Sequence, residues 1–150
     1  MTSPIKCVVD ASVCIKQFIP DSLASKTAQL FAHLANPDNQ IFVPDLLYIE
    51  SANALWRYIR AGQLTLARVQ TYLARLKSFP LQVVSTAELM EEAVTIGETY
   101  GISAYDASYV ALSHRVAAPM LTLDRRLVNS LASAPYDLRL FSDFSVPPLP

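Results

Sequence analysis

The chain of 150 residues has few cysteines, few charged side chains and no long apolar run. Its two cysteines, Cys7 and Cys14, have no second pair with which to build a disulfide framework or a zinc site, so we expect free, buried thiols. The apolar runs are too short to cross a bilayer. The N-terminal MTSPIK has no charged segment that leads into an apolar one, so we expect no secretion signal. These features together predict a cytoplasmic protein.

The balance of charge offers little general attraction for nucleic acid. Twelve Lys and Arg residues face thirteen Asp and Glu residues, which gives a net charge of −1 at pH 7. Binding to a polyanion would therefore need a local basic patch or bound cations. Hydrophobic residues make up 52% of the chain and charged residues 17%, which excludes a disordered polar chain. This apolar excess favours a partner or a dimer interface.

Short apolar segments alternate with helical patterns along the whole chain. We expect strands at 5–10, 40–43, 81–84 and 120–123, with an edge strand at 138–141. Helices are expected at 12–19, 22–35, 45–60, from 65 onward, at 86–100, 103–116 and 124–132, with caps at Asp45, Thr65, Thr86, Ser103 and Asp124. This alternation predicts an α/β fold with a mostly parallel sheet and helices on both faces. We expect a single domain over 1–150, with a core at about 5–141 and an extended, loose tail at 142–150.

Two acidic residues stand where predicted strands end. Asp10 follows the first strand, and Asp124 follows the fourth. Each has a simple structural explanation as the N-cap of the next helix. Because the carboxyl ends of parallel strands share one edge of a sheet, and sites in such sheets lie at that edge, we expect both carboxylates there.

Two further acidic residues lie on predicted helices. Glu50 has apolar and small residues three and four positions away, so it does not lie on an obvious solvent face. A rim glutamate paired with Arg57 is the structural alternative, because an unpaired buried carboxylate costs several kcal/mol. Asp106 follows Ser103 by three residues, which matches a capping box, and the start of that helix can also reach the sheet edge.

Four carboxylates at one edge repel each other unless a divalent cation neutralises them. Hard oxygen ligands without His or Cys select Mg²⁺ or Mn²⁺ rather than Zn²⁺. His33 and His114 stand alone in the sequence, and we interpret them as surface or core residues. The spacing therefore predicts an acidic metal site made of Asp10, Glu50, Asp106 and Asp124.

Four segments in this order, VVDASVCIKQF, IESANALWR, YDASYVALSHR and LTLDRRL, resemble the PIN domain. More narrowly, they resemble the VapC-type toxins of bacterial and archaeal toxin–antitoxin pairs, over about residues 5–141. The resemblance implies a three-layer α/β/α sandwich that carries a metal-dependent ribonuclease site. The family's four acids fall on Asp10, Glu50, Asp106 and Asp124, and its supporting residues fall on Ser12, Asn53 and Thr122. No acid is missing, although Gln17 stands where an aromatic residue is common.

The activity that the resemblance implies is endonucleolytic cleavage of RNA by metal-activated water, with one or two Mg²⁺ or Mn²⁺ ions at the four carboxylates. We predict phosphate contacts for Lys16, Arg125 and Arg126, each of which also has a plainer explanation as a solvated surface charge. The resemblance further implies a homodimer and a protein antitoxin. Such an antitoxin wraps apolar grooves of the toxin and obstructs its pocket.

Three other interpretations stay open at the level of sequence. A receiver-like Mg²⁺-binding signalling module would need an acid pair after the first strand and a lysine after a late strand, whereas Asp10 stands alone and MLTLD has no lysine. A non-catalytic binding protein would use the four acids as helix caps. A PIN-fold nuclease of RNA processing would share the site but not the toxin role. Small size without an appended domain favours the toxin.

Overall fold

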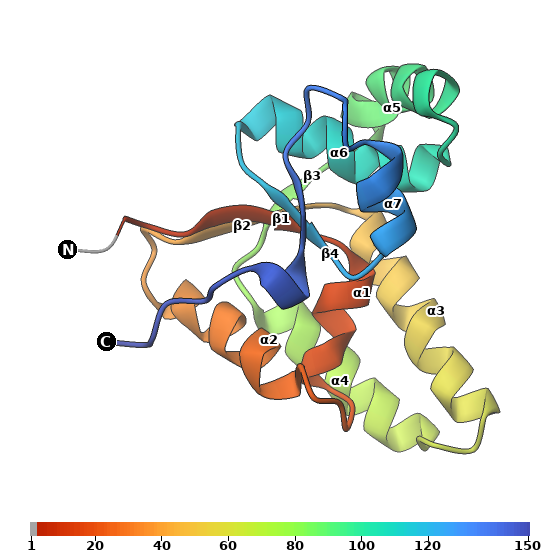
Figure 1. The fold of residues 1–150 in the computed structure, drawn as a ribbon. Helices are drawn as coiled ribbons and strands as arrows, with labels where there is room; N and C mark the ends of the chain where they lie inside the picture. The colour runs from red at the N-terminus through yellow and green to blue at the C-terminus, as the bar shows by residue number, and fades with distance from the viewer. Residues whose placement is uncertain (1–2) are drawn as a thin grey trace.

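A five-stranded parallel sheet forms the centre of the molecule (Figure 1). The computed structural model describes residues 3–150, and the strand order is β3-β2-β1-β4-β5. Every neighbouring pair is parallel, so the sheet predicted as mostly parallel is parallel throughout. The strands are β1 (Lys6–Val9), β2 (Gln40–Pro44), β3 (Gln82–Val84), β4 (Met120–Thr122) and β5 (Leu138–Leu140).

Helices cover both faces of this sheet, which confirms the three-layer α/β/α architecture. Helices α5 and α6 lie over one face, and α1, α2 and α4 lie over the other (Figure 1). The helices are α1 (Ala11–Cys14), α2 (Ala24–Ala32), α3 (Leu46–Arg60), α4 (Leu66–Ser78), α5 (Thr86–Tyr100), α6 (Ala104–Val116) and α7 (Arg125–Ser130). Short 3-10 segments occupy Ile15–Gln17, His33–Ala35 and Phe141–Asp143.

The central position of β1 explains its apolar sequence. Cys7, Val8 and Val9 are fully buried, because neighbouring strands and helices cover both faces of this strand. Residues 107–113 of α6 are buried without interruption, because the helix is packed between the sheet and α5. Cys7 and Cys14 are free and buried, as predicted. Within the described part of the chain, no helix is both long and apolar enough to cross a bilayer.

Most helix starts agree with the predicted caps. The side chains of Thr65 and Ser103 accept the backbone N–H groups of residues three positions later, at 3.2 and 3.1 Å. Gly101 ends α5 in the left-handed conformation, with φ of 70°. The first predicted helix is shorter than expected, because α1 gives way to a 3-10 turn at Ile15.

The Thr86 cap prediction is wrong, and the Asp45 prediction is right in position only, because Asp45 is the N-cap residue of α3 but does not cap it through its side chain. Asp45 makes no capping bond to its own helix, and its carboxylate instead accepts the backbone N–H of Thr86 at 3.1 Å. The cap of α5 is Ser85, whose hydroxyl accepts the N–H of Ala87, rather than Thr86. Because β2 and β3 are adjacent and parallel, the residues that follow them lie side by side, and this pairing outcompetes the local cap.

The C-terminal tail is extended but it is anchored, in contrast to the loose terminus that we expected. The carbonyl oxygen of Pro147 accepts a hydrogen bond from Gln29 Nε2 at 2.8 Å and lies 2.7 Å from His33 Nε2. Lys26 Nζ donates to the carbonyl oxygen of Phe141 at 2.5 Å. These contacts hold the tail along α2.

Candidate active site

Asp10 lies at the carboxyl end of β1 and caps α1, so the predicted capping role is confirmed. Its Oδ1 accepts the N–H of Val13 at 3.2 Å and the hydroxyl of Ser12 at 2.5 Å. Its Oδ2 accepts the hydroxyl of Thr122 at 2.5 Å. The side chain is nearly buried, with 8% of its surface exposed. All three donors are neutral, so they orient the carboxylate without balancing its charge.

The environment of Asp10 disfavours its ionised form. Burial raises the pKa of Asp10 from 3.8 to about 6, against the hydrogen bonds from Ser12, Thr122 and Val13, and the negative charge of Asp106 adds to the rise. At neutral pH the protein therefore holds a buried negative charge without a basic partner. Such a group is stabilised by a bound cation.

Hydroxyl groups tie the end of β1 to the end of β4. The hydroxyl oxygen of Ser12 accepts the N–H of Leu123, and that of Thr122 accepts the N–H of Asp124, both at 3.1 Å. Asp124 is exposed and caps α7 by accepting the N–H of Leu127 at 3.1 Å. Since β1 and β4 are adjacent parallel strands, the structure places Asp10 and Asp124 at the same sheet edge.

Glu50 is half-buried on α3, and its partner is a tyrosine rather than the arginine considered above. Its Oε1 accepts the hydroxyl of Tyr109 at 2.6 Å, and Tyr109 is 1% exposed on α6. The salt bridges among residues 3–150 are Lys16–Asp21 and Arg139–Asp137, so Arg57 does not pair with Glu50. Burial raises the pKa of Glu50, the Tyr109 hydrogen bond lowers it, and Asp106 raises it further.

Asp106 is the electrostatic centre of the group. It lies in the first turn of α6, where its backbone N–H donates to Ser103. Its carboxylate accepts no bond from the Ser103 N–H among the described contacts, so half of the predicted capping box is present. Burial and then the charge of Asp124 raise the pKa of Asp106. Because Asp106 raises the pKa of Asp10 and of Glu50 in turn, the four carboxylates share one electrostatic field.

The four carboxylates do not form a complete metal-binding cluster. Across residues 3–150, no three His, Cys, Asp or Glu side chains lie close enough together to hold a metal ion by themselves. The donor set still fits a hard divalent cation, since it consists of carboxylate oxygens, and the hydroxyls of Ser12 and Thr122 hold both oxygens of Asp10 in place. Mg²⁺ retains several water ligands in protein sites, so a few carboxylates suffice to hold it.

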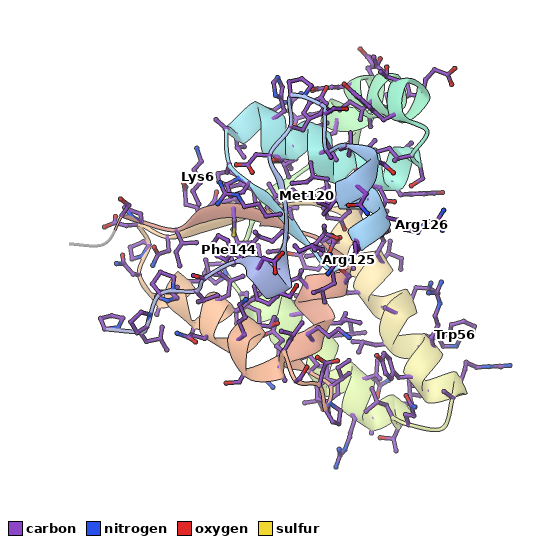
Figure 2. The ribbon with its side chains drawn as sticks, in the orientation of Figure 1. Lys6, Trp56, Met120, Arg125, Arg126 and Phe144 are labelled. Atoms are coloured by element: carbon purple, nitrogen blue, oxygen red, sulfur yellow. The ribbon has the colours of Figure 1, made fainter. Side chains whose placement is uncertain are left out.

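The other predicted site residues differ in exposure and in their contacts. Asn53 is exposed and lines an open groove together with Glu50. Arg125 and Arg126 are exposed at the start of α7 (Figure 2), and they follow Asp124 directly in the chain. Lys16 is committed to a salt bridge with Asp21 at 3.0 Å.

Tyr109 is the site residue that the sequence analysis missed. Its hydroxyl holds Glu50, and its ring is buried in the core. It follows Asp106 by three residues on the same helix, so it lies on the same helix face. That spacing is the signal that would have revealed it.

Comparison with known proteins decides the family. The model of the PIN domain family matches residues 7–130. The chain belongs to the PIN domain family. Ribonuclease VapC3 of Pyrobaculum aerophilum is 32% identical over 127 residues, which cover 83% of this chain and 94% of that protein. The PIN resemblance of the four sequence segments is therefore confirmed.

Solved structures share the PIN fold of this chain. PAE2754 of Pyrobaculum aerophilum has a TM-score of 0.66 at 23% identity, over 89% of this chain and 83% of that one. VapC20 of Mycobacterium tuberculosis, described as a Sarcin-Ricin loop cleaving toxin, has a TM-score of 0.62 at 18% identity, over 86% and 95%. A toxin–antitoxin complex from Klebsiella pneumoniae has a TM-score of 0.56 at 16% identity, over 87% and 93%. At these identities the likeness concerns the fold alone.

Proposed function

We propose that this PIN domain is a divalent-metal-dependent endoribonuclease and the toxin of a toxin–antitoxin pair. The observation that carries the proposal is the set of four carboxylates, from four separate parts of the chain, that interact at one sheet edge without a basic partner. The name of the relative Ribonuclease VapC3 and the description of VapC20 as a cleaving toxin support the same activity.

Asp10, Glu50, Asp106 and Asp124 would hold Mg²⁺ or Mn²⁺, in part through water. A metal bound there supplies charge neutralisation for the phosphate and a water molecule of lowered pKa. Ser12 and Thr122 donate to both oxygens of Asp10 and fix its orientation. Tyr109 fixes Glu50 in the same way, and the start of α6 presents Asp106. In this proposal, these contacts hold the carboxylates of Asp10 and Glu50 in place for the cation.

The basic residues near this edge would bring the RNA backbone to it. Arg125 and Arg126 are exposed beside Asp124 and make no salt bridge among residues 3–150, so their charges are available for phosphate. Lys16 is a weaker candidate because its ammonium group is already bonded to Asp21. With a net charge of −1, the protein relies on these local cations and on the bound metal to approach RNA.

We infer a protein antitoxin and a homodimer as partners in the cytoplasm. The toxin–antitoxin complex with the same fold supports the first. Met90 and Val94 of α5 are 59% and 60% exposed and lie one turn apart, which is the kind of surface that a partner covers. Purification together with a small protein from the neighbouring reading frame is the expected result. Absence of such a frame and of a co-purifying protein would favour a role in RNA processing instead.

The test of the proposed activity is incubation of the purified protein, freed of any partner, with total cellular RNA. Cleavage is expected with Mg²⁺ or Mn²⁺, and none with EDTA. Asp10→Asn should abolish it, whereas Glu98→Gln, an exposed carboxylate on α5, should cleave like the parent protein. Equal cleavage by Asp10→Asn, or cleavage that persists in EDTA, would contradict the proposal.

A further inference from the structure

The tail that follows β5 runs from one edge of the sheet to the other. It begins at Phe141, at the carboxyl edge, because all the strands are parallel. Residues 147–150 line a hollow of about 700 Å³ together with residues 3–5, which precede β1 at the opposite edge. Figure 1 shows the tail passing α2 on this course. The family match ends at residue 130, so the tail lies outside the matched PIN domain.

One side of α2 and of the turn after it presents hydrogen-bond donors to this tail. Lys26, Gln29 and His33 follow each other at intervals of three and four residues, so they lie on the same side. Lys26 Nζ donates to the carbonyl oxygens of Phe141 and Ser142 at 2.5 and 3.3 Å. The same ammonium group lies 4.7 Å from the centre of the Phe141 ring, which is a cation–π contact. Lys26 therefore holds the start of the tail.

The acceptor for the other two donors is the backbone of a proline. Gln29 Nε2 and His33 Nε2 lie 2.8 and 2.7 Å from the carbonyl oxygen of Pro147. Because a carbonyl oxygen only accepts, Nε2 of the buried His33 carries the proton. Pro147 and Pro148 have no backbone N–H, so this part of the tail offers carbonyl acceptors and no donor that needs a partner. A row of side-chain donors is complementary to such a segment.

Apolar side chains give the tail a second means of attachment. Phe144 and Val146 are half-buried and pack against the main core, whereas Ser145 between them is exposed. This alternation is typical of an extended segment that lays one face on the protein. Extended peptides are generally recognised through backbone hydrogen bonds and through contacts to alternate side chains. The tail makes both kinds of contact.

We propose that the side of α2 marked by Lys26, Gln29 and His33 is a groove for an extended, proline-containing peptide, and that residues 144–150 occupy it as an intramolecular strap. The ligand class is a segment with two alternate apolar side chains followed by proline carbonyls. The tether keeps the tail at an effective concentration on the order of millimolar, so the strap excludes free peptides of the same kind. The groove involves none of the four carboxylates, so this proposal is independent of the ribonuclease activity.

Chymotrypsin cleavage after Phe144 tests whether the full chain holds its tail. A protease acts on the released segment, so the rate follows the fraction of molecules in which the tail is free. Cleavage should be slow in the parent and about 2- to 10-fold faster in Gln29→Glu, because glutamate cannot donate to the Pro147 carbonyl. Gln70→Glu, an exposed position on α4, should be cleaved at the parental rate. Mass spectrometry of the released peptide 145–150 measures each rate.

A fluorescent peptide of residues 144–150 tests the groove itself by anisotropy. The full chain with both Phe144→Ser and Val146→Ser has a weakened strap and should bind this peptide. The parent should bind it at least about tenfold more weakly, because its own tail competes. Adding Gln29→Glu to the double variant should weaken the peptide about 2- to 10-fold, and adding Gln70→Glu should leave its binding unchanged.

Cleavage of the parent at the rate of the free peptide would overturn the proposal, because the tail would not be held. Protection that is lost on dilution would also overturn it and would assign the groove to the tail of a second copy. A folded double variant that binds no peptide would overturn the groove as a peptide site. If the double variant does not fold, the cleavage rates of the parent and of Gln29→Glu decide, and equal rates would contradict the proposal.

Discussion

At the scale of the residue, Asp10 carries a conflict between folding and function. Its pKa is raised to about 6, so the fold favours the protonated form. In the metal-free protein this group stabilises the fold below pH 3.8, and that contribution is lost as the pH rises through 6. The difference between a pKa of 3.8 and one of about 6 corresponds to at most about 3 kcal/mol in the free energy of unfolding. Metal-free Asp10→Asn should therefore be more stable than the parent at pH 8, by up to about 3 kcal/mol.

Urea unfolding in EDTA at pH 8 and at pH 4 measures this difference. The advantage of Asp10→Asn should shrink toward pH 4, where the parent is also neutral at this position. Glu98→Gln should show no such pH-dependent gain, since its carboxylate is exposed. An Asp10→Asn protein that is less stable than the parent at pH 8 would mean that its hydrogen bonds outweigh the cost of the buried charge.

Tyr109 is expected to act on the reaction through Glu50. Its hydroxyl hydrogen bond lowers the pKa of Glu50, so Tyr109→Phe should move the acidic limb of the profile of kcat/KM against pH to higher pH. The loss of this bond should cost about 1 kcal/mol of stability. Tyr100→Phe is the matched control, because the Tyr100 hydroxyl makes no hydrogen bond within the described structure. An unchanged pH profile in Tyr109→Phe would contradict a role for Tyr109 in the reaction.

At the scale of the element, the turn between α5 and α6 sets the position of Asp106. The N–H groups of Gly101 and Ile102 both donate to the carbonyl oxygen of Gly97, at 2.9 and 3.2 Å. A Cβ at Gly97 would lie 2.8 Å from the carbonyl oxygen of Ile102, which is backbone and cannot rotate away. This close approach requires glycine in the last turn of α5.

Gly97→Ala should therefore destabilise the protein and reduce cleavage, although alanine favours helix by about 1 kcal/mol. Crowding typically costs about 1–3 kcal/mol, and the displaced turn would shift Ser103 and the start of α6. Thermal unfolding and cleavage assays measure both effects. Glu98→Ala, an exposed neighbour on the same helix, should leave both unchanged. A more stable and fully active Gly97→Ala protein would contradict this account of the turn.

The elements also explain how much the sequence could predict. The strands are short apolar runs that end in polar residues, so β1 and the position of Asp10 after it were recognisable locally. Parallel pairing then predicted that Asp10 and Asp124 share an edge. The bond from Tyr109 to Glu50 spans 59 residues, and that from Thr86 to Asp45 spans 41. No local pattern records the bond between Thr86 and Asp45, so the role of Asp45 was missed. The spacing of Tyr109 from Asp106 indicates the helix face of Tyr109, but it does not name Glu50 as its partner.

At the scale of the whole molecule, the near-neutral charge predicts a shallow salt dependence of RNA binding. Each phosphate contact to a single strand contributes about 0.7 to the slope of log K against log salt. Arg125→Ala and Arg126→Ala should each lower the slope by about that amount and weaken binding evenly across sequences. Arg139→Ala, whose guanidinium group is paired with Asp137 at 2.9 Å, and Lys16→Ala should change it less. Unchanged slopes for both Arg125→Ala and Arg126→Ala would show that these residues do not contact RNA phosphates.

The central claim is that four carboxylates from separate elements act as one metal site, and Mn²⁺ binding to the purified protein tests it most directly. Calorimetry at pH 8 should give binding to the parent, weakened at least about tenfold by each of Asp10→Asn, Glu50→Gln, Asp106→Asn and Asp124→Asn. Glu98→Gln should bind like the parent. Parental affinity in all four site variants would contradict the account and leave these acids as helix caps and rim charges.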